Sequence, residues 1–257
     1  DRLANLGDAL SLFLCGGADL ANHVADPFDL GNDVTHGPAG IGHQLAAAFD
    51  LADAFANQSF DFAGGFGAAL GNDVSRLMAA VEPCRAILVA ARAAGMLVIH
   101  TREGHRPDLA DAPPAKVARG PADKRIGACG PMGRILIRGE AGHEIIPALA
   151  PLPGEPEIDK PGKGAFYQTD LELMLRNRGI ETLMVTGVTT EVCVHTTVRE
   201  ANDRGYRCLV LGDACASYFP EFHEVGLRMI AAQGGIFGWV STTTEVLAAL
   251  SGREQAA

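Results

Sequence analysis

Apolar residues alternate between helical and strand spacing from about residue 74 onward. Residues 74–94 carry apolar side chains at helical spacing and stop at Gly95, a residue type that often follows a helix. Further helices are predicted at about 191–204 and 221–233. Short apolar runs, each a predicted buried strand, lie at residues 96–99, 182–186, 208–211 and near Val240. This alternation predicts an α/β fold: a doubly wound, mostly parallel sheet with helices on both faces.

Polar residues are expected to end three of the strands. His100 follows the strand at 96–99, Asp213 follows the strand at 208–211, and Lys160 closes a brief strand at 157–159. In an open parallel sheet the ligand site lies beyond the carboxyl ends of the strands. Lys160 is therefore expected at the edge of the sheet where chemistry occurs.

Two stretches between these strands have distinct patterns. Residues 169–172 have the Thr-x-x-Glu form of a capping box, which predicts a helix that opens there and ends near Gly179. Residues 101–156 are rich in glycine, proline and charge. Such a long irregular insertion is usually functional surface, either a lid or a subunit contact.

The N-terminal residues 1–62 fit this pattern poorly. They are rich in alanine, glycine and aspartate, and their clean apolar run is 45–49. Alanine favours helix over strand, so this run is ambiguous. We therefore predict one domain over 63–257, preceded by an atypical segment over 1–62 that is a candidate for the first strand.

Composition and charge narrow the classes of partner. The chain has 257 residues, of which 47% are apolar, enough for one large domain with a full core. The formal charge of −10 argues against a nucleic acid or an acidic membrane as partner. No apolar run reaches about 18 residues, so no bilayer span is predicted. The N-terminal residues lack a signal-peptide pattern, which predicts a cytoplasmic protein.

Cys193 stands out among the six cysteines by its local context. It follows a predicted strand and the turn 187–190, and it lies at a predicted helix start. A helix N-terminus favours an anion, lowers the pKa of a thiol and offers free N–H groups to an oxyanion. The other cysteines have no CxxC or zinc-like spacing and are expected to be small buried residues; they are Cys15, Cys84, Cys129, Cys208 and Cys215.

Lysines and histidines near the predicted strand ends are the other candidates for a catalytic or metal-binding role. Lys160 and Lys163 are either cations that assist the thiol or ordinary solvated lysines. The spacing of His100 and His105 is compatible with a metal, but no Asp-x-His pattern accompanies it, so hydrogen bonding or packing is favoured. His195 lies two residues after Cys193 on a helix, where its ring should point away from the thiol.

These segments resemble a known family. Residues 187–201 are similar to the nucleophile motif of isochorismatase-like cysteine hydrolases, and Lys160 precedes residues 164–166 as the catalytic lysine of that family precedes its Ser-Ala-Phe segment. The resemblance extends from about residue 64 to 246. Within the family, the biuret and triuret hydrolase branch is most similar, through residues 100–109, 159–164 and 233–238.

The resemblance implies a metal-independent and cofactor-free mechanism in a homotetramer or other homo-oligomer. Cys193 attacks the carbonyl of a small ureido or amide substrate, ammonia leaves, and water cleaves the covalent intermediate, while Lys160 supplies positive charge. The N–H groups of Thr189, after a cis peptide, and of Cys193 form the oxyanion hole. Gln233 is expected to bind the substrate.

Two aromatic residues are further candidates for the substrate pocket. Phe166 and Tyr167 follow the lysine-containing segment closely in sequence. Tyr167 is equally consistent with an aromatic residue packed in a subunit interface.

The general base is the weakest part of the resemblance. In the family it is an aspartate at the end of the first strand, in a motif that is not intact here. We favour Asp50, because the chemistry requires a carboxylate at a strand end. Other alignments place Asp53, Asp61, Ala54 or Asn57 there. An asparagine cannot act as a base, so the last alignment would describe an impaired enzyme.

The sequence therefore predicts a cysteine-dependent amidohydrolase of a small linear ureido compound, with biuret or triuret first. The enzymatic alternative acts on another carbamoyl or amide substrate, such as an N-carbamoyl amino acid or a ureidoacrylate. The broken aspartate motif motivates a further alternative, a binding or scaffold protein that keeps the fold without the base. A redox-sensing role for Cys193 ranks last, since no resolving cysteine lies close in sequence.

Overall fold

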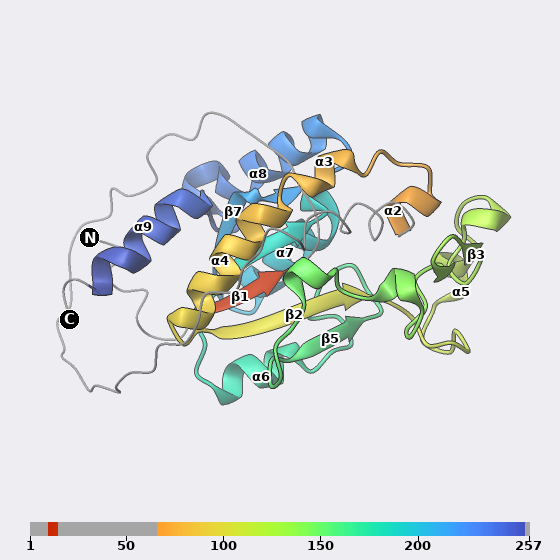
Figure 1. Cartoon of the computed structure of the whole chain (residues 1–257), viewed down its shortest axis with the longest axis horizontal. Helices are drawn as coiled ribbons and strands as arrows, with labels where there is room; N and C mark the ends of the chain where they lie inside the picture. The colour runs from red at the N-terminus through yellow and green to blue at the C-terminus, as the bar shows by residue number, and fades with distance from the viewer. Residues whose placement is uncertain (1–9, 15–65, 255–257) are drawn as a thin grey trace.

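Six parallel strands form the central sheet of the computed structural model, which describes residues 10–14 and 66–254 (Figure 1). Their order is β5-β2-β1-β6-β7-β8, and every adjacent pair is parallel. The strands are β1 (Leu10–Leu14), β2 (Leu97–Glu103), β5 (Glu157–Lys160), β6 (Thr182–Val188), β7 (Arg207–Ala216) and β8 (Trp239–Ser241). This confirms the predicted α/β fold.

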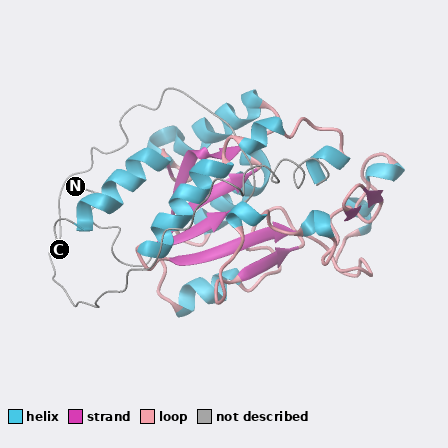
Figure 2. Cartoon of the chain, in the orientation of Figure 1, coloured by secondary structure: helices cyan, strands magenta, loops and turns pink. Residues whose placement is uncertain are grey.

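Helices cover both faces of the sheet, and alternate strand residues meet each layer. On one face Met184 packs with α4 (Val81–Ala93) and α9 (Thr243–Glu254). On the other face Leu183 and Val185 pack with a second set of helices, namely α6 (Leu171–Asn177), α7 (His195–Asp203) and α8 (Pro220–Gly235). The sheet is therefore doubly wound, as Figure 2 shows.

The segment between β2 and β5 is irregular and extends beyond the carboxyl edge of the sheet (Figures 1 and 2). Its short elements are α5 (Pro114–Val117), three 3₁₀ turns (Ala122–Lys124, Ala141–His143, Pro147–Leu149) and a small hairpin of β3 (Cys129–Gly130) and β4 (Gly133–Arg134). Two short helices, α2 (Phe66–Ala69) and α3 (Ser75–Met78), precede α4. The helix predicted over 74–94 is therefore two helices, α3 and α4.

Two strands run further than the sequence predicted. β2 continues past His100 to Glu103, where it pairs with β5. β7 continues past Asp213 to Ala216, with an irregular register against β6. Asp213 therefore lies inside β7 and does not end it. Its carboxylate accepts hydrogen bonds from the backbone N–H and the hydroxyl of Thr243, at the start of α9.

Two predicted helix starts also differ. α6 begins at Leu171, and the Thr169 hydroxyl accepts a hydrogen bond from the Leu171 N–H at 3.4 Å instead of forming the predicted capping box with Glu172. The helix predicted over 191–204 begins as a π-helical turn, η5 (Thr190–Val194), before α7. This wider turn carries Cys193.

The N-terminal segment supplies a central strand, although not from the expected residues. β1 (Leu10–Leu14) lies between β2 and β6, whereas we expected any strand of this segment at 45–49. Its sequence, Leu-Ser-Leu-Phe-Leu, suits a strand with a neighbour on each side. The candidate bases Asp50, Asp53 and Asp61, together with Asn57 and Ala54, lie outside the described residues.

Neighbouring leucines on α6 test the assignment of the core. Leu175 is 0% exposed and Leu173 is 61% exposed. Replacing Leu175 with alanine should lower the free energy of unfolding by about 2–5 kcal/mol, because it leaves a cavity under the sheet. Leu173→Ala should change it by less than about 0.5 kcal/mol. Urea denaturation measures both, and equal losses would contradict this packing.

Candidate active site

Lys160 and Cys193 meet at the carboxyl edge of the sheet. Lys160 is the last residue of β5, Cys193 lies in η5 directly after β6, and Lys160 Nζ is 3.3 Å from Cys193 Sγ. Lys160 is only 1% exposed. Its ammonium also donates to the carbonyl of Lys163 at 2.9 Å and, more weakly, to that of Gly162 at 3.4 Å. The structure thus makes Lys160 a buried cation beside the thiol and not a solvated surface lysine.

The turn that carries Cys193 has an unusual backbone. The peptide between Val188 and Thr189 is cis, as the resemblance implied. The Thr189 carbonyl accepts hydrogen bonds from the N–H groups of Val192 and Val194, each at 3.2 Å. Thr189 and Cys193, the predicted oxyanion-hole residues, therefore flank one tightly folded turn. Their role as an oxyanion hole stays a prediction.

A buried hydrogen bond ties this turn to α8. Thr190 Oγ1 and His223 Nδ1 lie 2.8 Å apart, and both residues are almost fully buried. Burial lowers the pKa of His223 to about 4, so its ring is neutral at physiological pH. Gly226, one turn further along α8, faces Thr190 with little room for a larger side chain. Sequence reasoning missed His223, because a histidine on a helix carries no local sign of its partner.

Tyr218 is a second residue that the sequence did not single out. It follows β7, and burial raises the pKa of its hydroxyl to about 12, with further contributions from the charges of Cys193 and Glu191. Its hydroxyl also lies against Gly67. Tyr218 therefore forms part of the surroundings of the thiol. The one sign of this role is the position of Tyr218 shortly after the end of a strand.

Glu103 adds a buried carboxylate to the site. It is the last residue of β2, and it accepts hydrogen bonds from Lys163 and Lys116, each at 2.9 Å. Burial alone would raise the pKa of Glu103, but the charges of Lys163 and Lys160 and the hydrogen bond from Lys116 outweigh it, so the pKa falls below 4.5. Glu103 is therefore ionised at neutral pH.

The three predicted substrate-binding residues lie in different surroundings, and their role in substrate binding stays a prediction. Phe166 is buried in the core against Tyr206, with ring centroids 5.7 Å apart. Tyr167 is half exposed, and its ring lies against Gly162, in the loop after Lys160. Gln233 is exposed near the end of α8, which runs from the end of β7 to the start of the parallel β8. Gln233 lies in a stretch, Ala232–Gly234, that departs from helical geometry near the end of α8.

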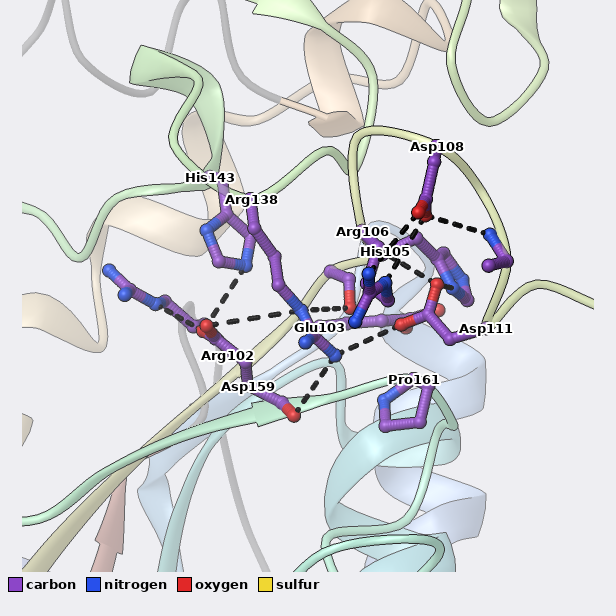
Figure 3. A network of polar contacts seen from close by, with 12 residues as sticks. Arg102, Glu103, His105, Arg106, Asp108, Asp111, Arg138, His143, Asp159 and Pro161 are labelled. Atoms are coloured by element: carbon purple, nitrogen blue, oxygen red, sulfur yellow. Dashed lines mark hydrogen bonds and ion pairs between the residues drawn. The ribbon is translucent and has the colours of Figure 1, made fainter.

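Three histidines, one in β2 and two in the following insertion, have carboxylate neighbours. His100 Nε2 lies 2.9 Å from Glu155, and in Figure 3 His105 faces Asp111 while His143 faces Asp159. The described residues contain no group of three side chains suited to a metal ion. His195 Nδ1 accepts a hydrogen bond from Arg199 at 2.9 Å, which directs that ring along α7 and not toward the thiol.

Comparison with protein families identifies the fold. The model of the Isochorismatase domain matches residues 51–245, most of the chain. The chain belongs to the isochorismatase family. Its match begins one residue after Asp50, so Asp53 and Asp61 lie within the matched region and Asp50 lies just outside it.

Relatives within the isochorismatase family are amidohydrolases. The chain is 36% identical over 216 residues to the ureidoacrylate amidohydrolase RutB of Methylorubrum extorquens, covering 80% of this chain and 82% of the relative. It is 30% identical over 220 residues to the protein of the same name from Enterobacter sp. (strain 638), covering 81% of this chain and 90% of the relative. The prediction of a hydrolase acting on non-peptide C–N bonds is confirmed at this level, and the relatives favour the ureidoacrylate alternative over biuret or triuret.

Solved structures of the isochorismatase family agree. A cysteine hydrolase from Pseudomonas syringae pv. phaseolicola 1448A is 32% identical with a TM-score of 0.59, over 68% of this chain and 81% of that chain. An isochorismatase family protein from Desulfovibrio vulgaris, 23% identical with a TM-score of 0.61, covers 95% of this chain and 99% of that chain and supports the fold alone. No described helix is long and apolar enough to cross a membrane.

The His223 contact predicts a pH dependence of stability. The pKa of His223 is 6.5 in its ordinary state and about 4 in the folded protein. The unfolded chain therefore binds a proton that the folded chain does not, and stability falls as pH drops from 6.5 to 4. His223→Asn, which can keep the bond to Thr190, should reduce this slope by up to about 1.4 kcal/mol per pH unit. Urea denaturation between pH 4 and 7 measures it, and parallel curves for both proteins would contradict the assignment.

Proposed function

We propose that this protein cleaves a C–N bond of a small linear ureido compound, with Cys193 as the nucleophile. The observation that carries the proposal is the 3.3 Å contact between the buried Lys160 ammonium and Cys193 Sγ. The thiolate is the nucleophilic form of cysteine, and the adjacent ammonium can balance its negative charge during attack. The amidohydrolase relatives support the same class of bond.

In the first step the Cys193 thiolate attacks the ureido carbonyl carbon. The carbonyl π electrons move to oxygen, and we expect the N–H groups of Thr189 and Cys193 to bind that oxyanion. The intermediate then collapses, the C–N bond breaks, and the departing nitrogen takes up a proton to leave as ammonia. The remaining group is joined to Cys193 as a thiocarbamate.

In the second step water attacks the thiocarbamate carbon and the C–S bond breaks. The thiolate returns, and the product leaves as a carbamate. A general base accepts the proton first of the thiol and later of the water. Asp50 stays the predicted base, with Asp53 and Asp61 as alternatives inside the family match. Lys160 balances the negative charge of the thiolate in both steps.

Two kinds of ureido substrate have support. A ureidoacrylate or another carbamoyl acid is supported by relatives that are 36% and 30% identical over most of their length. Biuret or triuret is supported by the segments 100–109, 159–164 and 233–238, which resemble that branch of the family. On the support of these relatives we rank the carbamoyl acid first. A homo-oligomer, tetrameric by the resemblance, and a cytoplasmic location stay predictions.

A panel of substrates tests the proposed class. Purified protein should release ammonia from ureidoacrylate, biuret or triuret, with kcat/KM for one of them exceeding that for simple amides by about 100-fold or more. Ammonia release is measured with a coupled assay at neutral pH. Equal slow turnover of all amides would contradict a ureido substrate. Binding of these compounds without ammonia release would favour the scaffold alternative.

Substitution of the nucleophile gives the second test. Cys193→Ala should lower kcat by about 10³-fold or more, because no other group in the turn can form the covalent intermediate. Lys160→Met should lower it by about 100-fold through loss of the adjacent charge. Cys129→Ala, which removes an exposed cysteine, is the matched control and should leave kcat unchanged. Full activity in Cys193→Ala would refute the proposed mechanism.

A further inference from the structure

Glu103 occupies a central position in a cluster of three lysines. Its side chain is 8% exposed, and its backbone lies opposite Lys160 in the register of β2 and β5. Both of its oxygens lie 2.9 Å from Lys163 Nζ, and one of them is also 2.9 Å from Lys116 Nζ. A carboxylate this buried is retained only where cations compensate its lost hydration. The pairing of one acid with two lysines therefore requires an explanation.

Both lysines connect Glu103 to the loop that holds Lys160. Lys116 Nζ donates to the carbonyl of Pro161 at 2.6 Å. Lys163 presents its own carbonyl to Lys160 Nζ at 2.9 Å. The side chains of Lys116 and Lys163 thus attach the two ends of residues 161–163 to one carboxylate. The carbonyl groups of this loop fix the position of the Lys160 ammonium.

The far side of the same loop is held by α7. The N–H of Ala165 donates to Thr197 Oγ1 at 3.1 Å, and the N–H of Phe166 donates to Glu200 Oε2 at 3.2 Å. Glu200 lies so close to Gly164 that a side chain there would collide with it. Because α7 directly follows the turn that carries Cys193, one end of the loop is fixed relative to the thiol. Glu103 fixes the other end.

We propose that Glu103 is a positioning residue that holds the Lys160 ammonium against Cys193 Sγ by anchoring Lys163 and Lys116. The proposal rests on the proposed function, in which Lys160 and Cys193 act together. Glu103 itself neither touches the thiol nor takes part in proton transfer. Its effect is exerted through the carbonyl groups of residues 162 and 163.

Removal of the Glu103 charge separates positioning from simple electrostatics. Without this negative charge the surroundings become more positive, which by itself would favour the thiolate and speed its reaction with iodoacetamide. Loss of the anchor has the opposite effect, because the ammonium no longer stays at the sulfur. The sign of the change therefore distinguishes the two roles.

The experiment measures alkylation of Cys193 by iodoacetamide from pH 5 to 9, read from the Cys193 peptide by mass spectrometry. We expect Glu103→Gln to slow alkylation at pH 7 by about 10-fold and to lower kcat more than it changes KM. The exposed Cys129 in the same sample reports on the reagent and should be unaffected. A faster or unchanged reaction at Cys193 would overturn the positioning role.

Two further variants keep the test decisive. Glu155→Gln removes another carboxylate, which pairs with Arg92 of α4 and His100 of β2 and is remote from the loop 161–163, and it should not slow alkylation. If Glu103→Gln does not fold, Lys163→Met removes the other half of the anchor and should slow alkylation similarly; an unchanged rate would overturn the proposal. Should the wild type release no ammonia from any ureido compound, the proposed function fails, while the alkylation rates still decide the role of Glu103.

Discussion

The buried ammonium of Lys160 constrains the whole carboxyl edge of the sheet. Removing a lysine charge from water costs several kcal/mol unless nearby groups compensate it. Here the compensation comes from the Cys193 sulfur at 3.3 Å and from loop carbonyls, the nearest at 2.9 Å. These partners come from separate parts of the chain, β5 with its following loop and the turn after β6. The fold must therefore bring both strand ends together before the charge can be buried.

Parallel strand order meets this requirement. β2 and β1 lie between β5, which ends at Lys160, and β6, which leads to Cys193. All four strands are parallel, so their carboxyl ends share one edge. Glu103 at the end of β2 and Tyr218 after β7 reach the same region from either side. The Thr190–His223 bond then joins the thiol turn to α8. The chemistry thus depends on contacts between segments that are far apart in sequence.

The fold class, Cys193 and Lys160 could be predicted because each has a local sign. Apolar periodicity reveals strands and helices, and a cysteine or lysine directly after a strand is placed at the reactive edge. Glu103, His223 and Tyr218 could not be predicted in the same way, since their roles depend on partners outside their own segment. Gln233 was carried over from the resemblance alone, and its role in substrate binding stays a prediction. The strand β1 was missed because Leu10–Leu14 lies apart from the alternation of helices and strands that begins near residue 74.

A covalent intermediate on Cys193 is the central claim, and rapid-quench mass spectrometry tests it most directly. Protein mixed with ureidoacrylate, biuret or triuret and quenched in acid within milliseconds should carry the added mass of the substrate-derived carbamoyl group, joined to sulfur as a thiocarbamate, on the peptide that contains Cys193. The adduct should disappear as substrate is consumed. Turnover with ammonia release, but with no mass added to that peptide at any quench time, would contradict nucleophilic catalysis by Cys193.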